Sequence, residues 1–335
     1  MKKRRMTALI LLVTVVIGMF AGCNNAVTEE QSSEVSLSPI EISKENSKYI
    51  SSPYSGRFVG LRKDGTVVGK SMDSDYEDKA GSLKVSNWED IVAVSAGSSN
   101  TVGLKSDGTC VATGDNQNGQ CDVYDWTDIV KVVSGGYHTV GLKSNGRVLA
   151  VGSDSYGKTN VNDWVDIVDI YAGFDKTVGL KADGTIVAVG YKTGILDWIN
   201  VCGVFEWTDI VKILYLGWNE IIGLKADGTL VFAGDYDDKG EMLKRHEIMS
   251  QWEDIVDISE VGNGFIGLKS DGTLVHTDDF KFGDMNYIAF DNLNDVIAIS
   301  ENFLLRSNGE VLYLQYIGNK YDSYYVIETN VNLFS

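Results

Sequence analysis

The side chains that most often carry catalysis or bind metals are few in this sequence, and they are far apart. Its three histidines are His138, His246 and His276. They show no metal-ligand spacing, and no nucleophile motif, phosphate loop or paired-carboxylate signature accompanies them. We therefore interpret the histidines as surface or turn residues. We expect no catalytic residue, no metal and no cofactor, so the protein is predicted not to be an enzyme.

The four cysteines are too sparse for a disulfide framework. They stand at Cys23, Cys110, Cys121 and Cys202. Cys110 and Cys121 are close enough in sequence to be bridged. Cys110 also fits its strand position as a small buried apolar residue. Both interpretations stay open on sequence grounds.

Two acidic loops, residues 73–78 and 235–240, raise the question of calcium. The second begins like an EF-hand loop. However, Lys239 occupies a ligand position and His246 stands where the closing glutamate belongs. We interpret both segments as solvated loops.

The scattered polar residues are set in a repeated phrase, apolar-Gly-Leu-Lys-x-Asp-Gly-Thr-apolar. Its turn glycines are Gly65, Gly108, Gly146, Gly184, Gly228, Gly272 and Gly309. They follow one another at spacings of 43, 38, 38, 44, 44 and 37 residues. Self-similarity at this period indicates a repeat architecture.

One repeat reads as three antiparallel strands. Residues 129–134 form a β-branched run, residues 139–143 a second strand and residues 148–152 a third. Asn145-Gly146 supplies the positive φ that a tight hairpin needs. Such a small meander cannot bury both faces alone, and stacking equivalent units into a closed ring solves the problem. We predict an all-β, seven-bladed β-propeller over residues 48–335.

A second marker, Trp-x-Asp, precedes most first strands. Its tryptophans are Trp88, Trp126, Trp164, Trp207 and Trp252, and a degenerate copy begins at Leu293. We interpret the tryptophans as packing between blades. We interpret the aspartates as turn-capping side chains, and the glycines before each repeated leucine as places where backbones crowd near the ring axis. The first and last copies are the most degenerate, as expected where a ring closes.

The N-terminus has a basic start, an apolar run over about residues 7–20 and small residues before Cys23, which is typical of a secretory signal peptide. Residues 20–23, Phe-Ala-Gly-Cys, resemble the lipobox of bacterial lipoproteins, although Phe20 stands where that family usually has leucine. The resemblance implies removal of residues 1–22 and acylation of Cys23. Residues 23–47 read as a polar tether, and more than one acyl chain would hold the protein stably on a membrane.

The net charge of −18 excludes one class of partner. Removing residues 1–22 takes away four basic residues and no acid, which leaves 25 basic and 47 acidic residues and a charge of −22. Binding to nucleic acid requires Lys and Arg to replace counterions on phosphate. We therefore expect no nucleic-acid partner, and membrane contact only through the lipid anchor.

Residues 95–120 run Ser-Ala-Gly-x-x-Asn-Thr-Val-Gly-Leu-Lys-x-Asp-Gly-Thr and end in Asn-x-x-Gly-Gln. This phrase resembles the regulator of chromosome condensation repeat, and the resemblance extends over about residues 48–315. It implies a seven-bladed propeller. The family histidine survives only as His138, and the Gly-Gln half survives well only at Gly119-Gln120. Secreted bacterial relatives include a protein inhibitor of a hydrolytic enzyme, so the resemblance also implies that the scaffold can bind proteins.

The loops that join the first and second strands lie on one rim of a propeller, and three successive loops carry an aromatic residue: Tyr137, Phe174 and Trp218. Loop-tip aromatics are enriched in binding hot spots. A long insertion carries the basic pair Lys244 and Arg245. We predict that these five residues contact a partner.

We expect a monomeric lipoprotein on the extracytoplasmic face of the cell membrane, with a protein-binding or adaptor role. Two alternatives stay open within binding: recognition of a cell-wall or dietary glycan by the rim aromatics, and inhibition of an extracellular hydrolase. A third class is a hydrolase or lyase with a site in the central channel.

Overall fold

The computed structural model describes nine stretches of the chain, which all belong to one compact unit, Leu37–Ser335. The described residues are 48–52, 57–73, 77–191, 207–216, 220–234, 241–261, 264–277, 293–317 and 323–334. Cys23, Cys202, Trp218 and the loop at 235–240 lie outside them, as do residues 74–76 of the first acidic loop.

The described residues form seven antiparallel sheets, each built from strands that follow one another in the sequence. The first three sheets are β1 (Ile50–Ser51), β2 (Arg57–Leu61) and β3 (Val67–Ser71); β4 (Ile91–Ala96), β5 (Asn100–Lys105) and β6 (Cys110–Gly114); β7 (Ile129–Ser134), β8 (His138–Lys143) and β9 (Val148–Gly152). The next three are β10 (Ile167–Ala172), β11 (Lys176–Lys181) and β12 (Ile186–Gly190); β13 (Ile210–Leu216), β14 (Glu220–Lys225) and β15 (Leu230–Gly234); β16 (Ile255–Val261), β17 (Gly264–Lys269) and β18 (Leu274–His276). The seventh has β19 (Val296–Ser300), β20 (Phe303–Arg306), β21 (Glu310–Ile317) and β22 (Ser323–Asn332).

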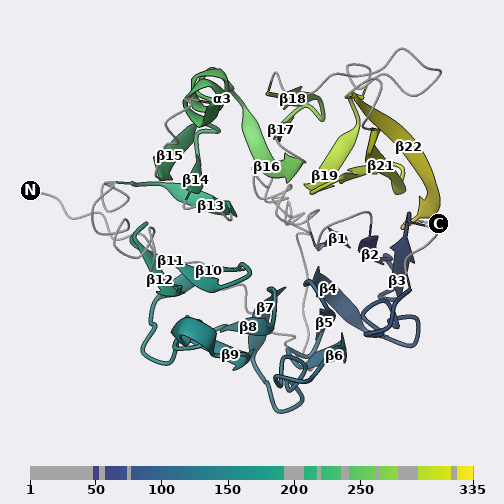
Figure 1. The fold of residues 1–335 in the computed structure, drawn as a ribbon, viewed down its shortest axis with the longest axis vertical. Coiled ribbons are helices and arrows are strands. Elements are labelled where there is room, and N and C mark those ends of the chain that lie inside the picture. Colours follow the sequence, from purple (N-terminus) through teal and green to yellow (C-terminus); the bar gives the residue numbers. More distant parts are fainter. Residues whose placement is uncertain are drawn as a thin grey trace, which may run out of the picture. The chain divides into compact units, whose positions relative to one another are not determined.

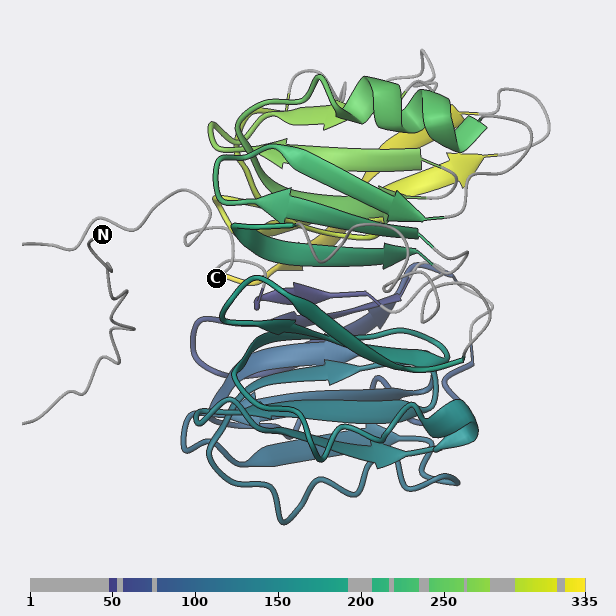
Figure 2. The ribbon, with the colours of Figure 1, turned by 90° about the vertical axis from the view of Figure 1, so that its left-hand side faces the viewer.

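The first strand of each sheet lies innermost, and each inner strand contacts the inner strands of the two neighbouring sheets. The contacts run from β1 through β4, β7, β10, β13 and β16 to β19, and β19 returns to β1. The sheets therefore close into a ring of seven blades around a central axis (Figure 1), with their strands running between the two rims (Figure 2). The predicted seven-bladed propeller is confirmed.

The repeated Asp-Gly-Thr makes the turn between second and third strands. In blade 2, Asp107 Oδ1 accepts hydrogen bonds from the backbone N–H of Thr109 at 2.9 Å and from its hydroxyl at 2.6 Å. Gly108 has a φ of +80°, which an L side chain rarely adopts. The same aspartate-to-threonine bonds recur at Asp64, Asp183, Asp227 and Asp271.

The repeated tryptophans lie between blades, as predicted, but the repeated glycines serve a different purpose from the one we expected. A Cβ on Gly141 would lie 2.6 Å from Cζ3 of Trp126. Trp126 is buried in a cluster with Leu104 and Val132. The glycine therefore makes room for the indole ring on the middle strand, and backbone crowding at the axis is not its cause. Gly103, Gly179, Gly223 and Gly267 face their own tryptophans in the same way.

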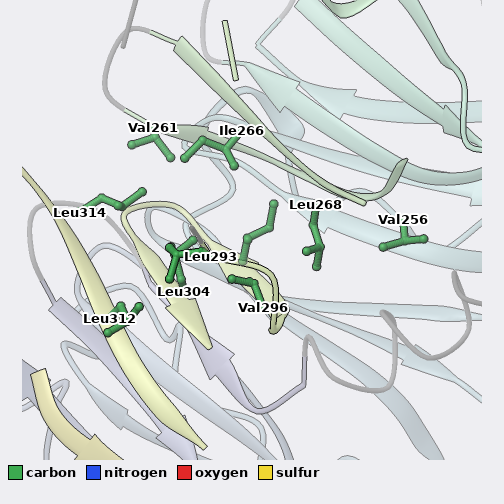
Figure 3. Packing of buried hydrophobic residues seen from close by; sticks show 10 residues of the cluster. Val256, Val261, Ile266, Leu268, Leu293, Val296, Leu304, Leu312 and Leu314 are labelled. Carbon is green, nitrogen blue, oxygen red and sulfur yellow. The ribbon is translucent and has the colours of Figure 1, made fainter. Parts of the chain in front are cut away.

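Blade 7 replaces both members of this pair. Leu293 occupies the tryptophan position, and Leu304 occupies the glycine position, opposite Ile299 in the register. Both leucines are fully buried in one cluster between blades 6 and 7 (Figure 3). The two leucine side chains thus fill the space that the indole ring of tryptophan fills alone in blades 2 to 6, where its partner is a glycine.

The aspartates of Trp-x-Asp also have a different structural role from the one predicted. Asp90, Asp128, Asp166, Asp209 and Asp254 all have φ between 59° and 62°. The carbonyl of Asp128 accepts a 2.9 Å hydrogen bond from the N–H of Ser144 in the hairpin turn. Asp and Asn tolerate this left-handed backbone better than other residues with a side chain. The position therefore selects aspartate for its backbone, and not for capping by its carboxylate.

Hydrogen bonds to serine hydroxyls and ion pairs join neighbouring inner strands close to the ring axis. Serine hydroxyls accept backbone N–H groups of the next blade: Ser259 from Glu301 at 2.8 Å, Ser300 from Ser52, Ser51 from Ala96, and Ser95 from Ser134, each of these three at 3.0 Å. These four bonds connect blades 6, 7, 1, 2 and 3 without a break. Ion pairs take over on the other side of the ring, from Lys131 to Asp169 and from Lys212 to Asp257.

Candidate functional site

The loops between first and second strands gather on one rim, which we call the first-loop rim (residues 97–99, 135–137, 173–175 and 301–302). At its centre lies a pocket of about 160 Å³. The inner strands β1, β4, β7 and β10 form most of its wall, together with the glycine-containing loops that follow β4, β7 and β10. Its polar and aromatic lining includes Ser51, Ser95, Ser134, Tyr171, Phe174 and Glu301.

The structure brings together two of the predicted partner-binding residues. The rings of Tyr137 and Phe174 meet edge to face, with their centroids 5.1 Å apart and their planes at 75°. Tyr137 is 38% exposed and Phe174 is 52% exposed. Phe174 also borders the pocket. The third predicted aromatic, Trp218, lies outside the described residues.

A buried lysine supports this aromatic pair. Only 1% of the Lys158 side chain is exposed. Its Nζ donates to the carbonyl of Phe174 at 3.1 Å, and it lies 3.8 Å from Asp175 and 5.7 Å from the centre of the Tyr137 ring. Sequence reasoning missed Lys158. The signal was present, because Gly157-Lys158 takes the place of Gly119-Gln120, and the carbonyls of Lys158 and Gln120 accept equivalent threonine hydroxyls.

The prediction that the histidines lie at the surface was wrong for two of them. His138 is completely buried, and its Nε2 is 2.8 Å from the hydroxyl of Thr177 in the next blade. Burial, together with the positive charge of Lys158, lowers the pKa of His138 to about 3. His138 is therefore a neutral hydrogen-bonding group between blades. Asn100 has the same place in blade 2 and donates to Thr139 at 3.0 Å.

The predicted basic pair lies elsewhere. Lys244 and Arg245 belong to α3 (Glu241–Met249), which packs on the outer edge of blade 5 (Figure 1). His246 of this helix is buried and stacks on Phe232 of β15, with the ring centres 4.3 Å apart. Lys244 is exposed and Arg245 is partly exposed. Neither residue lines the pocket on the first-loop rim.

A second aromatic pair on the same rim was not predicted. Tyr156, in η1 (Ser155–Gly157), meets Tyr191 edge to face with the ring centres 4.5 Å apart. The two side chains are 60% and 38% exposed. Tyr191 is tied to the loop of Phe174 by a 3.0 Å bond from its N–H to the carbonyl of Asp175. Blades 3 and 4 thus carry four exposed aromatic residues on this rim.

Glu301 is the most unusual residue of the pocket, and sequence reasoning missed it as well. It stands in the two-residue turn between β19 and β20, with a φ of +46°. Burial raises the pKa of Glu301 to about 8, and the negative charge of Glu260 acts in the same direction, whereas Arg57 opposes it. A left-handed glutamate with a perturbed pKa in a pocket is a candidate functional group.

The cysteines of the described part are not bridged. Cys110 and Cys121 are both free thiols. Burial raises the pKa of Cys110 to about 12 and that of Cys121 to about 11. Thiols with such high pKa values are poor nucleophiles. Cys110 lies in the core, as the second of the two open interpretations stated.

Over the described stretches, no group of three or more His, Cys, Asp or Glu side chains is arranged to hold a metal ion. In the same stretches, no helix has the length and apolar character needed to span a membrane.

Comparison with known proteins agrees with this architecture. Residues 91–120 and 129–158 match the family model described as the regulator of chromosome condensation (RCC1) repeat. These two segments are thus RCC1 repeats, and the same phrase recurs in the other blades. A search of curated protein sequences gave no significant match.

Several solved structures share the fold at low sequence identity. The CRINKLY WD40 ectodomain of the receptor kinase ACR4 from Arabidopsis thaliana is 17% identical, with a TM-score of 0.53, and the alignment covers 78% of this chain and 92% of that one. Prp20p from Saccharomyces cerevisiae is 14% identical, with a TM-score of 0.53 and coverage of 86% and 89%. Yeast RCC1 (Prp20) in its complex with Kap60 gives 14% identity, a TM-score of 0.53 and coverage of 92% and 91%. At these identities the likeness concerns the fold.

Proposed function

We propose that this propeller is a non-enzymatic binding protein that recognises a protein partner through its first-loop rim. The observation that carries the proposal is the exposed aromatic pair Tyr137–Phe174, held in place by the buried Lys158. Exposed aromatics on a rigid support lose little entropy when they bind, which is why Tyr and Trp are frequent in binding hot spots. The second pair, Tyr156–Tyr191, enlarges the same apolar surface.

The binding partners of structurally similar proteins support a protein partner over a glycan. Prp20p is described by its binding to Gsp1p and histones, and the yeast RCC1 structure holds Kap60. In addition, the rings of Tyr137 and Phe174 stand at 75° to each other, so they form a ridge instead of one flat platform for a sugar ring. Inhibition of an extracellular hydrolase is one form that this protein binding could take.

We further propose that the propeller works on the extracytoplasmic face of a membrane, held there by acylated Cys23. The support is the basic and apolar N-terminus and the lipobox-like Phe20-Ala21-Gly22-Cys23. A polar tether over residues 23–47 would give the rim access to partners in solution.

The test is affinity capture with matched variants. The full chain carrying Cys23→Ser, which removes the acylation site, is immobilised and exposed to cell-envelope and culture extracts. The same protein with Tyr137→Ala and Phe174→Ala runs beside it. Tyr124→Ala is the control, because this tyrosine is 84% exposed and lines a different pocket, which it shares with Lys105 at the other end of β5.

The proposal expects a polypeptide that the parent and the Tyr124→Ala protein retain and the double variant loses. Titration of that purified polypeptide should then show binding weakened at least about tenfold in the double variant, as for a hot-spot pair. Equal retention by all three proteins would contradict a role for the rim aromatics. Absence of any retained polypeptide would contradict the adaptor role.

A further inference from the structure

Glu301 is held in a conformation that its residue type does not favour. Its φ of +46° is the left-handed region, where glycine or asparagine would fit the two-residue turn with less strain. Its backbone N–H is nevertheless fixed, because it donates to Ser259 at 2.8 Å. The turn therefore presents a carboxyl group at the pocket at a cost in backbone energy. Such strain is commonly kept where the side chain has a task.

Burial and two neighbouring charges set the protonation of Glu301, and burial is the largest cause of its raised pKa. Glu260, on the neighbouring strand β16, raises the pKa of Glu301, and Arg57 of β2 lowers it. Arg57 is buried and its Nη2 donates to the carbonyl of Ser98 at 3.2 Å, so it is fixed in the wall beside the pocket. The buried site therefore favours the protonated, neutral form of Glu301 while no ligand is bound.

The pocket also holds a hydroxyl group with nothing to bind. Ser134 is 8% exposed and lines the pocket, and its Oγ has no hydrogen-bond partner among the described residues. A buried hydroxyl without a partner costs free energy, so Ser134 Oγ would gain from a hydrogen bond to a group that enters the pocket. The nearby rings of Tyr171 and Phe174 add π-faces that attract cations.

The size of the pocket limits what can enter. Its volume of about 160 Å³ is well below the roughly 300–1,000 Å³ of sites for drug-sized ligands. The end of one long side chain fits such a space, whereas an oligosaccharide does not. The opening lies on the first-loop rim, beside Phe174.

We propose that this pocket binds the cationic end of a lysine or arginine side chain of the protein partner, with Glu301 as its counter-ion. That the cation belongs to a polypeptide rests on the proposed function. That the pocket binds a cation rests only on the residues that line it. On binding, the cation replaces the proton of Glu301, Ser134 Oγ accepts one of its N–H groups, and Phe174 covers its alkyl stem.

The experiment uses small probes and the full Cys23→Ser chain. N-acetyl-lysine amide and N-acetyl-arginine amide are titrated by calorimetry and followed by NMR, with N-acetyl-citrulline amide as the neutral mimic of arginine. A dissociation constant of about 1 mM is expected for the cationic probes, which is ordinary for the binding of one side chain. Citrulline amide should bind at least about tenfold more weakly, because a hydrogen bond to a charged group is worth about 1.5–3 kcal/mol.

Two variants and one control test the residues. Glu301→Gln should weaken the cationic probes at least about tenfold. Ser134→Ala keeps every charge and should weaken them by about three- to tenfold. Glu89→Gln changes the net charge equally at an exposed site and should leave binding unchanged. Thermal melting of each variant confirms that the fold is intact.

A proton balance completes the test. Because the cation displaces the proton of Glu301, binding at pH 7 should release close to one proton, seen by calorimetry in buffers of different ionisation enthalpy. Equal affinity for citrulline and arginine amides, or an unchanged affinity in Glu301→Gln, would overturn the proposal. A partner that still needs Tyr137 and Phe174 would then leave the proposed function standing. A site that binds free amines but no lysine-containing peptide would refute the polypeptide source.

Discussion

Leu333 lies over Gly60 in blade 1 in the way that Trp126 lies over Gly141 in blade 3. A Cβ on Gly60 would be 2.6 Å from Cδ2 of Leu333. The N–H of Leu333 also donates to the carbonyl of Gly309 at 2.8 Å, a bond that Ile129 makes to Gly108 farther along the ring. The end of the described chain thus supplies the wedge between blades 7 and 1.

Loss of this wedge should destabilise the whole ring. Leu333→Ala removes a fully buried side chain and is expected to lower the free energy of unfolding by about 2–5 kcal/mol. Urea denaturation followed by tryptophan fluorescence measures the effect. Leu243→Ala on α3 is the matched control, since Leu243 is 49% exposed and should change stability by less than about 0.5 kcal/mol. Equal effects of the two substitutions would contradict a wedge role for Leu333.

The tryptophan and glycine positions should be energetically coupled. Gly141→Leu places a side chain where the Trp126 ring lies, and overpacking of this kind costs about 1–3 kcal/mol. Trp126→Leu alone leaves a cavity. The double variant reproduces the Leu293–Leu304 pair of blade 7, so its loss of stability should be smaller than the sum of the single losses by at least about 1 kcal/mol. Additive losses in a double-mutant cycle would disprove the coupling.

Glu301 should make the protein less stable as pH rises. Its pKa is about 8 in the folded protein, against 4.5 for an ordinary glutamate. Between these values the folded protein holds a proton that the unfolded chain has lost, so the free energy of unfolding falls as pH rises from about 5 to about 8. Denaturation at pH 5, 7 and 9 should show this fall in the parent and in Glu89→Gln, and a smaller one in Glu301→Gln. Parallel curves for all three proteins would contradict the assignment.

His138 should act in the opposite direction and in a more acidic range. Its pKa is about 3 when folded and 6.5 when unfolded, so the unfolded chain takes up a proton first as the solution becomes acidic. The stability from neutral His138 is complete above about pH 6.5 and is lost as pH falls towards 3. His138→Asn copies Asn100, which bonds to the neighbouring threonine without titrating. This variant should unfold at a lower pH than the parent; unfolding at the same pH would exclude His138 as a cause of acid sensitivity.

The regular blades could be predicted from sequence because the same local rules act in each copy. Asp107-Gly108-Thr109 forms its turn through contacts within three residues, so the phrase alone identifies it. Glu301 could not be found this way. Its blade lacks the three-residue, glycine-containing loop of blades 2 to 4, and its pKa depends first on burial in the folded ring and then on Glu260 and Arg57, which lie far from it in sequence.

The wrong interpretations of His138 and of the repeated glycines also come from contacts that a local pattern does not show. His138 looks like an exposed loop-end residue until Thr177 of the next blade is placed against it. The repeated glycines were assigned to the axis because a one-dimensional pattern does not show that an indole ring lies over the middle strand. In both cases the missing information was a contact between neighbouring blades.

The contacts that join neighbouring inner strands differ around the ring. Hydrogen bonds to serine hydroxyls join blades 6, 7, 1, 2 and 3, and those to Ser300 and Ser51 lie on either side of blade 1. Between blades 4 and 5 the described residues offer neither a serine bond nor a Lys–Asp pair, and apolar packing of Ile186 and Ile213 joins them. Apolar contacts allow sliding that directed hydrogen bonds resist. The closure of the ring between blades 7 and 1 therefore rests on directed hydrogen bonds, which preorganise the walls around Glu301 and Ser134 for a ligand.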